Sequence, residues 1–466
     1  MTMIFNALSG ALAAQAALNT NSQNIANAAT PGYTRQGVLL SSQQSSGRGV
    51  NAAGNGVQVS SLLRFSDGFK SQQLWQANSN LGQYNAGQSY LDQLEQVMSD
   101  DTANINQGLD AFFAALNAAS VQPDSQPLRD QVLTSAGALA KRITAQQQLY
   151  TTQHASLIEQ RGAAVSQING YTQDIALLNK QIAAGQSTGI NTSGLQDARD
   201  QKVDALASLV GIQVVEQNDG TRSVSLRNGQ PLVSGSNAAQ LSLDSTGTLK
   251  LGFSNTTFTV PTTNLGGQLG GLQDYEQQVL TPLQTSVSEL AQGIATTFNT
   301  QLAAGFTPAG TPGQPLFSYS NGMLGMMPLA ASDLAFSSNA AASGDGGNLT
   351  LLIGLKSATV NLTAFDTQGN KIPDGLGGFV TKAVVLGDVY TQLVGTLGVQ
   401  SQQNQAGQTT AQTVRDQAQA NWASTSGVNT DEEAINLMQY KQMYDANMKV
   451  IGVANDLFDS TLAMIR

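Results

Sequence analysis

The clearest hydrophobic pattern lies at the C-terminal end of the chain. One stripe repeats there in alternating steps of three and four residues, a heptad spacing that keeps one face of a helix turned toward a partner helix. Thr430 stands three residues before Glu433, which is typical of a capping box, and Asp431 and Glu432 suit the positive end of a helix dipole. The stripe consists of Ala434, Leu437, Lys441, Tyr444, Met448, Ile451, Asn455, Phe458, Leu462 and Ile465.

The N-terminus carries a matching pattern. Its stripe predicts one helix that ends before Pro31-Gly32. The simplest partner for each terminal stripe is the other, so we predict a coiled-coil stem built from residues 1–36 and 427–466. The N-terminal stripe consists of Ile4, Leu8, Ala11, Gln15, Leu18, Ser22 and Ile25.

A plainer interpretation of the two stripes is a pair of ordinary amphipathic helices in a globular domain. Both stripes are narrow and contain polar residues, namely Gln15, Ser22, Lys441 and Asn455. Polar residues at seam positions cost stability and commonly fix register or partner choice. This composition favours helices that assemble with partners.

The interior of the chain is mainly helical by its periodicity. The longest periodic segment, 128–184, predicts one helix of about 57 residues, which would span about 85 Å. A helix of this length is expected in a rod-shaped subunit and is unusual in a globular domain. We therefore predict an elongated helical body over 66–304 and 386–426. Its other expected helices cover 66–119, 195–209, 272–303 and 386–424.

The period changes to two in parts of the chain, which predicts strands. Residues 211–260 alternate between turn signals such as Asn218-Asp219-Gly220 and Asn228-Gly229, which indicates a β meander. Residues 305–385 are rich in proline and glycine and predict an inserted β-rich outer domain, with strands at 349–355 and 358–362. Residues 37–65 predict a flexible connector or a small extended arm, and the alternation over 57–60 indicates a short strand. The expected fold is mainly α with β insertions, and the β regions are expected to lie farthest from the stem.

Composition narrows the function classes. The chain has 466 residues with 21 Lys and Arg against 31 Asp and Glu, a net charge of −10. That balance argues against nucleic acid or an anionic membrane as the main partner. There is no cysteine, and no basic region precedes an apolar run at the N-terminus, so we expect neither disulfides nor a cleavable signal peptide. No stretch approaches the roughly 18 apolar residues of a membrane span.

Few side chains are arranged for catalysis or metal binding. His154 is the single histidine and lies on the stripe of the long predicted helix, where a packing or solvated role is expected. The acids 431–433 suit a helix N-terminus, and 344–348 lacks the spaced carboxylates of a calcium loop. Trp75 and Trp422 are expected in the core of the helical body. We predict no enzyme activity, no cofactor and no metal site.

Segments near both ends of the chain, and two in its interior, resemble a known family. Residues 24–36, with the sequence NIANAATPGYTRQ, resemble the N-terminal signature of bacterial flagellar rod, hook and hook-associated proteins. Residues 426–434, followed by Tyr440 and Tyr444, resemble the C-terminus of the hook-associated protein 1 family. Phe112-Phe113 and the stretch 228–235 are similar to internal parts of the same family. The alternatives left open are a rod or hook subunit, and an exported peptidoglycan hydrolase.

The resemblance implies a structural adaptor that joins hook to filament and is needed for filament assembly. It implies export through the flagellar type III system and a final location outside the cell, at the hook–filament junction. The implied partners are copies of the chain, hook protein, the second junction protein (hook-associated protein 3), an export chaperone and the export gate. Neither nucleic acid nor membrane is among them.

The stem stripes supply the residues for these contacts. We expect the helices of the stem to be poorly folded alone and to order when they dock. The expected contacts to other subunits and to the hook are Ile4, Leu8, Leu18, Ile25, Leu437, Tyr444, Met448, Ile451, Asn455, Phe458 and Leu462. The subset expected to bind the export chaperone first is Leu437, Tyr444, Met448, Ile451 and Phe458.

Overall fold

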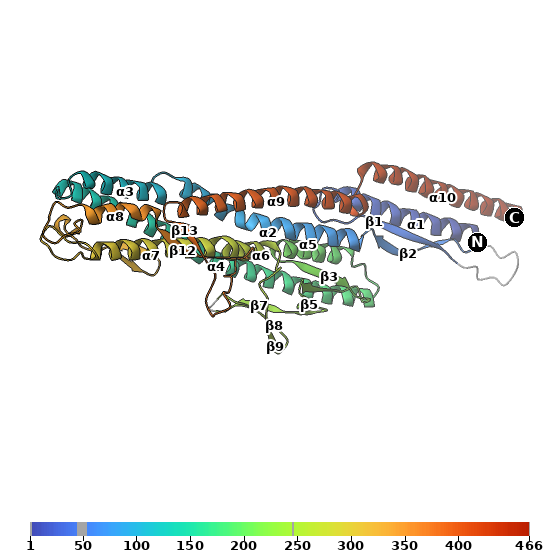
Figure 1. Ribbon diagram of the computed structural model, residues 1–466. Coiled ribbons are helices and arrows are strands. Elements are labelled where there is room, and N and C mark those ends of the chain that lie inside the picture. The colour runs from blue at the N-terminus through green and yellow to red at the C-terminus, as the bar shows by residue number, and fades with distance from the viewer. Residues whose placement is uncertain (1, 44–53, 245–246, 466) are drawn as a thin grey trace.

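The structure is a computed structural model that describes residues 2–43, 54–244 and 247–465. It consists of a long helical body and a stem that projects from one end of the body (Figure 1). The N-terminus and C-terminus both lie in the stem, so the chain leaves the stem, forms the body and returns. The stem contains α1 (Thr2–Ala26), β1 (Gln36–Ser42), β2 (Val57–Arg64) and α10 (Thr430–Ile465).

Long helices make up most of the body. The helix predicted over 128–184 is confirmed as α4, a continuous helix of 62 residues that begins after Ser125 with a proline in its first turn. At 1.5 Å per residue such a helix is about 93 Å long, which sets the length of the body. The body helices are α2 (Gly68–Ser99), α3 (Ile105–Val121), α4 (Gln126–Ser187), α5 (Ser193–Leu209), α6 (Gly267–Tyr275), α7 (Thr281–Ala303), α8 (Gly347–Gly354) and α9 (Val389–Ser426).

Two of the predicted helices are interrupted. The segment predicted over 66–119 is divided into α2 and α3, because Asn104 caps a new helix by accepting from the backbone N–H groups of Asn106 and Gln107. The segment predicted over 272–303 contains a π-helical turn, Glu276–Leu280, between α6 and α7.

A small apolar cluster joins α2 to α9, and two large ones hold most of the body together. The larger one joins α3, the first half of α4, and α7, and its centre contains the rings of Phe112, Phe113, Phe298 and Phe317, with centroids 5.1–6.0 Å apart. The smaller one joins the second half of α4 and α5 to the strands that follow. Aromatic pairs at these distances add to the stabilisation from burial.

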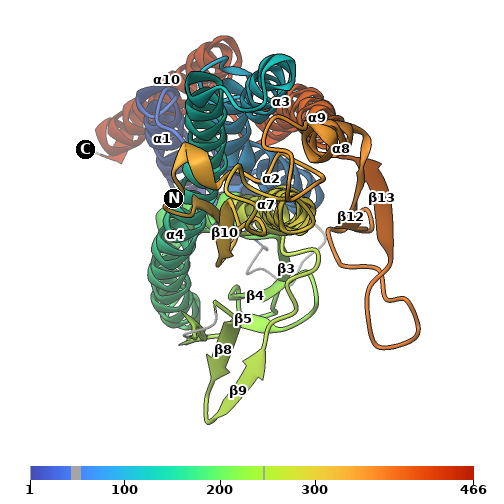
Figure 2. The same ribbon diagram turned by 60° about the vertical axis from the view of Figure 1, so that its left-hand side comes forward.

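The predicted meander over 211–260 is confirmed and forms two small antiparallel sheets, visible beside the helical body in Figure 2. Gly220 and Gly229 adopt the positive φ that the turns require. The first sheet contains β3 (Ile212–Glu216), β4 (Arg222–Leu226), β5 (Pro231–Ser234) and β6 (Asn237–Ala238). The second contains β7 (Gln240–Leu243), β8 (Leu249–Phe253) and β9 (Thr256–Thr259).

The order of elements suggested that the β regions lie farthest from the stem, but the two sheets of the meander do not. Figure 1 shows the sheets along the side of the body, whereas α3, α7 and α8 form the end opposite the stem. The expectation was wrong because α4 runs back toward the stem, so that the strands after α5 start close to it.

The region 305–385 also differs from the outer domain that was expected. The predicted strand at 349–355 is wrong, because this apolar run forms α8, with Leu349 and Leu352 buried on one face and Leu351 exposed. A short apolar run fits a strand or a buried helix equally well by spacing alone. The other expected strand is present as β12. The remaining strands are β10 (Phe317–Ser320), β11 (Met323–Met326), β12 (Thr359–Thr363) and β13 (Thr381–Val385).

This region also shares the core of the body. Phe317, Phe336, Leu349 and Val360 belong to the same apolar cluster as α3, α4 and α7. The inserted residues are therefore part of the helical body and have no separate core among the described residues.

The expected flexible connector contains regular structure. The structure agrees with the alternative of an extended arm: β1 and β2 pair as an antiparallel hairpin with a bulge between Leu39 and Leu40, and β2 contains the strand expected over 57–60. The hairpin lies along α1. The central part of the predicted connector, 44–53, lies outside the described residues.

Candidate assembly site in the stem

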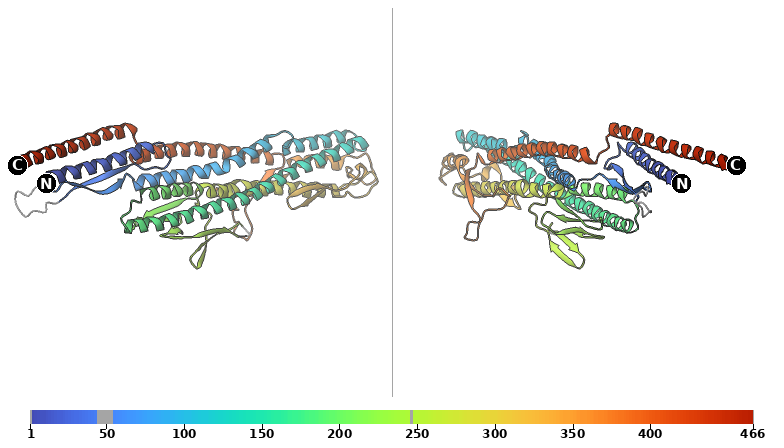
Figure 3. Two further views of the ribbon diagram at one scale, coloured as in Figure 1. Left: turned by 180° about the vertical axis from the view of Figure 1, so that it is seen from behind. Right: turned by 90° about the vertical axis from the view of Figure 1, so that its right-hand side faces the viewer.

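The two ends of the chain lie side by side as α1 and α10, as both views in Figure 3 show. The inner face of α1 consists of small residues: Ala7, Ala11, Ala14 and Ala17 are all buried. At Gly10 the helices are so close that an added Cβ would lie 2.5 Å from Oδ1 of Asn447. The helices therefore pair through alanine and glycine, which bury little apolar area.

The predicted seam is wrong in its detail. We expected the large apolar residues of the two stripes to pack on one another, but Leu8 and Ile25 of α1 are exposed, and Ile4 and Leu18 are only half-buried. On α10, Leu437, Tyr444 and Ile451 are half-buried, whereas Met448, Asn455, Phe458 and Leu462 are exposed. Alanine has little weight in a hydrophobic pattern. The spacing of apolar residues therefore pointed to the stripe of bulkier residues beside the alanine face.

Large apolar side chains are consequently exposed on the outer surface of the stem. Phe458 is 64% exposed and Phe5 is 61% exposed. Contiguous exposed apolar side chains mark interaction surfaces in soluble proteins. The other large exposed residues of the stem are Met3, Leu8, Leu12, Ile25, Leu39, Leu40, Val59, Leu62, Leu63, Ile435, Met438, Met448, Val453, Leu457, Leu462 and Met464.

A buried polar cluster joins the two ends of the chain, and we call Asn21, Asn24, Arg35 and Glu433 the Glu433 cluster. Glu433 is 2% exposed. Its Oε2 accepts hydrogen bonds from Nδ2 of Asn21 at 2.5 Å and from Nδ2 of Asn24 at 3.1 Å. Its Oε1 accepts from Nε of Arg35 at 2.7 Å, and Arg35 also pairs with the exposed Glu432 at 3.0 Å.

Asn24 connects this cluster to the loop that follows α1. Its Oδ1 accepts from the backbone N–H of Gln36 at 3.0 Å and from the hydroxyl of Tyr33 at 2.9 Å. Its Nδ2 also donates to the carbonyl of Gln36 at 2.8 Å. Burial, with the carboxylates of Asp197 and Glu433, raises the pKa of the Tyr33 phenol, so the phenol remains a neutral donor. The residues of the N-terminal motif thus hold one another and the C-terminal motif in place.

The start of α10 differs from the predicted capping box. Asn429, and not Thr430, caps the helix: its Oδ1 accepts from the backbone N–H groups of Asp431 at 3.0 Å and Glu432 at 3.4 Å. Glu433 does not serve only the helix dipole, because its carboxylate is taken up by Asn21, Asn24 and Arg35. Sequence reasoning missed this role. The one available signal was a lone arginine in the first motif and a glutamate in the second.

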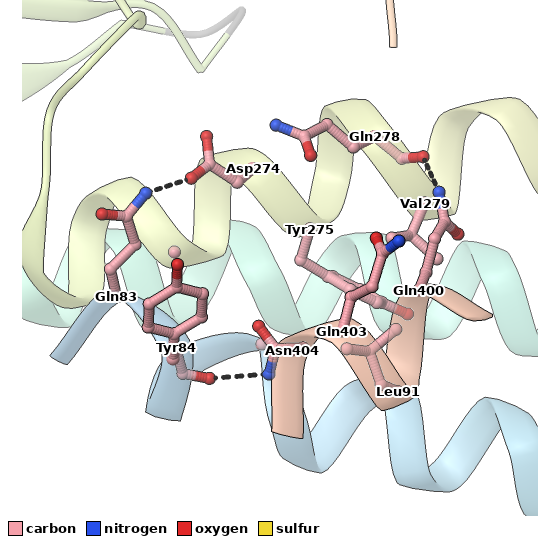
Figure 4. Close-up of a pocket in the computed structure, with 12 residues that line it drawn as sticks. Gln83, Tyr84, Leu91, Asp274, Tyr275, Gln278, Val279, Gln400, Gln403 and Asn404 are labelled. Carbon is pink, nitrogen blue, oxygen red and sulfur yellow. Dashed lines mark hydrogen bonds between the residues drawn. The ribbon is translucent and has the colours of Figure 1, made fainter. Parts of the chain in front are cut away.

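The body offers a groove, whose lining side chains Figure 4 shows. It lies between α2, α6 and α9 and is lined mainly by amides, with Asp274 as its single carboxylate. Oδ2 of Asp274 accepts from Nε2 of Gln83 at 2.5 Å, and burial raises the pKa of this carboxyl. The other titratable groups of the lining are the phenols of Tyr84 and Tyr275, and burial raises the pKa of Tyr275.

The remaining chemical candidates are structural. His154 is partly exposed and its Nε2 lies 3.0 Å from Oε1 of Glu276, which also pairs with Arg161 at 2.7 Å. Over the residues that the structure describes, no three acidic or histidine side chains gather as metal ligands. Within the same ranges, no helix combines the length and the apolar character needed to cross a membrane.

Comparison with known proteins finds relatives over nearly the whole chain. Residues 91–317 match the model of the helical domain of flagellar hook-associated protein FlgK, and residues 419–464 match that of the C-terminal region of flagellar basal body rod FlgEFG proteins. The chain is 29% identical to flagellar hook-associated protein 1 of Escherichia coli K12, with 99% of each chain covered. Identity to the Bacillus subtilis protein of the same name is 26%, over 97% of this chain and 95% of that protein.

The fold has a solved counterpart. The flagellar hook junction protein FlgK from Burkholderia pseudomallei superimposes with a TM-score of 0.57 at 19% identity. The similarity covers 75% of this chain and 99% of the solved chain. At this identity the likeness concerns the fold.

Proposed function

The chain belongs to the flagellar hook-associated protein 1 family, and on that premise we propose that it is the structural adaptor that joins the flagellar hook to the filament. The observation that carries the proposal is the construction of the stem. The two motifs that resemble the family meet in the Glu433 cluster, and the stem that they form presents its large apolar residues to the outside.

The stem explains how such an adaptor would assemble. Identical subunits that make head-to-tail contacts form a ring or a helical tube. An apolar stem surface gives each subunit a face to bury against its neighbours, and the charged fraction of only 11% leaves little repulsion between copies. The partners in this proposal are copies of the chain, hook protein on one side, and hook-associated protein 3 on the other.

We assign the contacts with other subunits and with the hook to the predicted stripe residues. The exposed members, Leu8, Ile25, Met448, Asn455, Phe458 and Leu462, are available in the described conformation. The half-buried members, Ile4, Leu18, Leu437, Tyr444 and Ile451, contribute the edges that remain accessible.

Export precedes assembly in this proposal. The chain leaves the cell through the flagellar type III system, and before export a chaperone covers Leu437, Tyr444, Met448, Ile451 and Phe458. Because three of these residues are half-buried beside α1, the chaperone would bind them fully only when α10 has left α1. Ile451→Asp and Phe458→Asp should then weaken both chaperone binding and hook docking. Unchanged binding in both assays would remove this assignment.

The proposed function is tested in a strain of the source bacterium that lacks this protein. Electron microscopy should show bare hooks, and flagellin should appear in the culture medium, because filament subunits are exported but find no junction. Absent hooks would move the protein to the rod or hook. Intact filaments would reopen the case for an exported enzyme such as a peptidoglycan hydrolase.

A further inference from the structure

A loop projects from the body between β12 and β13, and we call residues 364–380 the finger. Figure 2 shows it standing off the helical body. Leu376 at its tip is 93% exposed, which makes it the most exposed large apolar residue that the structure describes. The finger also exposes Ile372, Phe379 and Val380. Exposed apolar side chains gathered in this way mark a surface that another molecule covers.

Two aspartates hold the finger in a defined shape. Oδ1 of Asp374 accepts from the backbone N–H groups of Leu376 at 2.7 Å and Gly378 at 2.9 Å. Asp366 fixes the other turn of the finger in the same way, through two backbone N–H groups at 2.8 and 2.9 Å. A loop that is already ordered loses little conformational freedom when it binds, which lowers the cost of association.

A groove of about 450 Å³ lies between α2 and α9. All of its lining residues belong to these two helices. They include the apolar side chains of Val394 and Leu397 and the carboxylates of Asp92 and Glu95. The groove therefore offers apolar contact together with negative charge, and it suits an apolar side chain that is flanked by cations.

A glycine of α9 keeps this groove open. Gly398 lies inside the helix, where glycine is less favourable than alanine because the unfolded chain loses more freedom. A Cβ added at Gly398 would lie 3.8 Å from Oε1 of Glu95, which is ordinary contact distance. Packing within the chain therefore does not require this glycine. A side chain of another molecule that enters the groove would account for it.

The finger and the groove carry opposite charges. Lys371 of the finger and Lys382 of β13 are both exposed, and among the described residues neither lies within ion-pair distance of a carboxylate. Asp92 and Glu95 are three residues apart on α2, so they lie on the same face of the helix. The chain has a net charge of −10, so most of the surface of a copy repels an acidic groove. A basic site such as the finger is then selected as the one that fits.

A second copy of the chain is the occupant that supplies both surfaces. We propose that the finger of one copy enters the α2–α9 groove of its neighbour, with Leu376 on the apolar lining and the lysines facing Asp92 and Glu95. This inference rests on the proposed function, in which copies of the chain assemble at the junction. It adds a contact between bodies to the contacts assigned to the stem.

The positions of the two surfaces suit neighbours that stand side by side. The finger and the groove are different parts of the chain, so the contact is heterologous and every copy can use both, as in a ring or a helical tube. The strand β13 leads into the start of α9, so both surfaces lie at a similar level along the body (Figure 1). Two copies at nearly the same height can therefore meet through them.

Chemical cross-linking tests this contact in assembled flagella. Because the natural chain has no cysteine, Leu376→Cys and Gly398→Cys in one chain place one thiol on the finger and one in the groove. The variant is expressed in the strain that lacks this protein, and isolated flagella are treated with a short bismaleimide reagent. We expect a ladder of dimers and higher oligomers on a denaturing gel, because every copy carries both thiols.

Three controls accompany the ladder. Each single cysteine variant should remain monomeric after treatment. Val121→Cys combined with Gly398→Cys should also remain monomeric, because Val121 is an equally exposed apolar position, at 81%, but lies at the end of α3 and outside the finger. Electron microscopy of the same cells shows whether filaments are attached.

A charge exchange provides a second test that needs no cysteine. Lys371→Glu with Lys382→Glu, and Asp92→Lys with Glu95→Lys, should each lower the fraction of cells with filaments. All four substitutions together should restore it, because the opposite charges face each other again. Lys141→Glu makes the same change at an exposed lysine of α4 and should have no effect. The amount of each variant outside the cell and its melting temperature establish export and folding.

The outcomes separate this inference from the proposed function. Attached filaments without a ladder would overturn the finger contact and leave the proposed function intact. A charge exchange that neither impairs nor restores filaments would overturn the finger contact as well. Intact filaments in the strain without any copy of the chain would instead remove the proposed function.

Discussion

The stem and the body are both built from long helices, but they place their large apolar residues on opposite sides. In the body, Phe112 and Phe298 are completely enclosed and lie against each other at 5.1 Å. In the stem, alanine fills the interior, and Phe5 and Phe458 face outward. Helical periodicity describes both regions equally well. It does not tell which stripe faces the partner within the chain and which remains for another molecule.

This difference changes what holds each region together. Burial of apolar surface contributes about 25 cal/mol per Å², so the body gains stability from its own side chains. The inner face of the stem buries mostly methyl groups, and its main specific contact is the Glu433 cluster. We infer that the body is stable alone and that the stem reaches full stability when its outer face is covered.

The largest expected effect is a difference in stability loss between two Phe→Ala variants, one in the body and one in the stem. Phe298→Ala should lower the free energy of unfolding of the body by about 3–5 kcal/mol, because it leaves a cavity in the aromatic cluster. Phe458→Ala should change the stability of the isolated chain by less than about 0.5 kcal/mol. Chemical denaturation followed by circular dichroism measures both. Equal losses in the two variants would contradict the comparison.

The next effect concerns the polar interior of the stem. Glu433→Gln removes the buried carboxylate charge that pairs with Arg35, while Arg35 keeps Glu432 as a partner. We expect the free energy of unfolding of the stem alone to fall by about 2–3 kcal/mol. Hydrogen exchange should show faster exchange in α1 and α10 and no change in α4. The control is Glu432→Gln, an exposed position where the loss should stay below about 1 kcal/mol. Slow exchange throughout α10 in Glu433→Gln would show that the cluster does not hold the two ends together.

A smaller effect is expected from crowding the alanine face. Ala14→Leu places a larger side chain between α1 and α10 and should cost about 1–3 kcal/mol, again only in the stem. Its neighbour Gln15 is exposed, so Gln15→Leu controls for added apolar surface. Limited proteolysis should release the terminal helices of the Ala14 variant first. If both variants resist proteolysis equally, the helices are not paired through the small residues.

The smallest effect is a pH dependence at the boundary between the two regions. Burial raises the pKa of the Asp204 carboxyl, which accepts a hydrogen bond from Asn78 at 2.5 Å. A raised pKa means that the folded chain favours the protonated carboxyl. The stabilisation is therefore complete below the ordinary pKa of aspartate and is lost as pH rises through the raised value.

The matching variant is Asp204→Asn, which cannot ionise. The melting temperature of Asp204→Asn, relative to that of the unchanged chain, should increase as pH rises from acid to neutral. A constant difference between the two melting temperatures over this range would show that Asp204 has the same pKa in the folded and unfolded chain.

The parts of the fold that were predicted correctly rest on local signals. The long apolar stripe of α4 and the Asn-Gly turn between β4 and β5 are each contained in a short stretch of chain. The strand predicted in place of α8 was wrong, because a short apolar run such as Leu349 to Ile353 fits a strand and a buried helix equally well. The prediction of which face of α1 packs on α10 was wrong, because alanine carries little weight in any hydrophobic pattern.

The site itself could be predicted only in part. Both motifs were identified, and the pairing of the two chain ends followed from their stripes. The contact between Arg35 and Glu433 joins residues 398 positions apart, and no spacing rule relates such positions. The contact between Arg64 and Asp197 is similar, because Asp197 lies 133 positions beyond Arg64 and looks like any other acid on a helix.

The central claim is that the outward apolar face of the stem, and not its interior, makes the contacts of assembly. The most direct measurement introduces the double variant Leu8→Asp and Leu462→Asp, two exposed stripe residues that are not assigned to the chaperone, into the strain that lacks this protein. We predict that the variant is exported with a folded body, that electron microscopy shows bare hooks, and that flagellin is lost to the medium. Normal filaments on these cells would contradict the account.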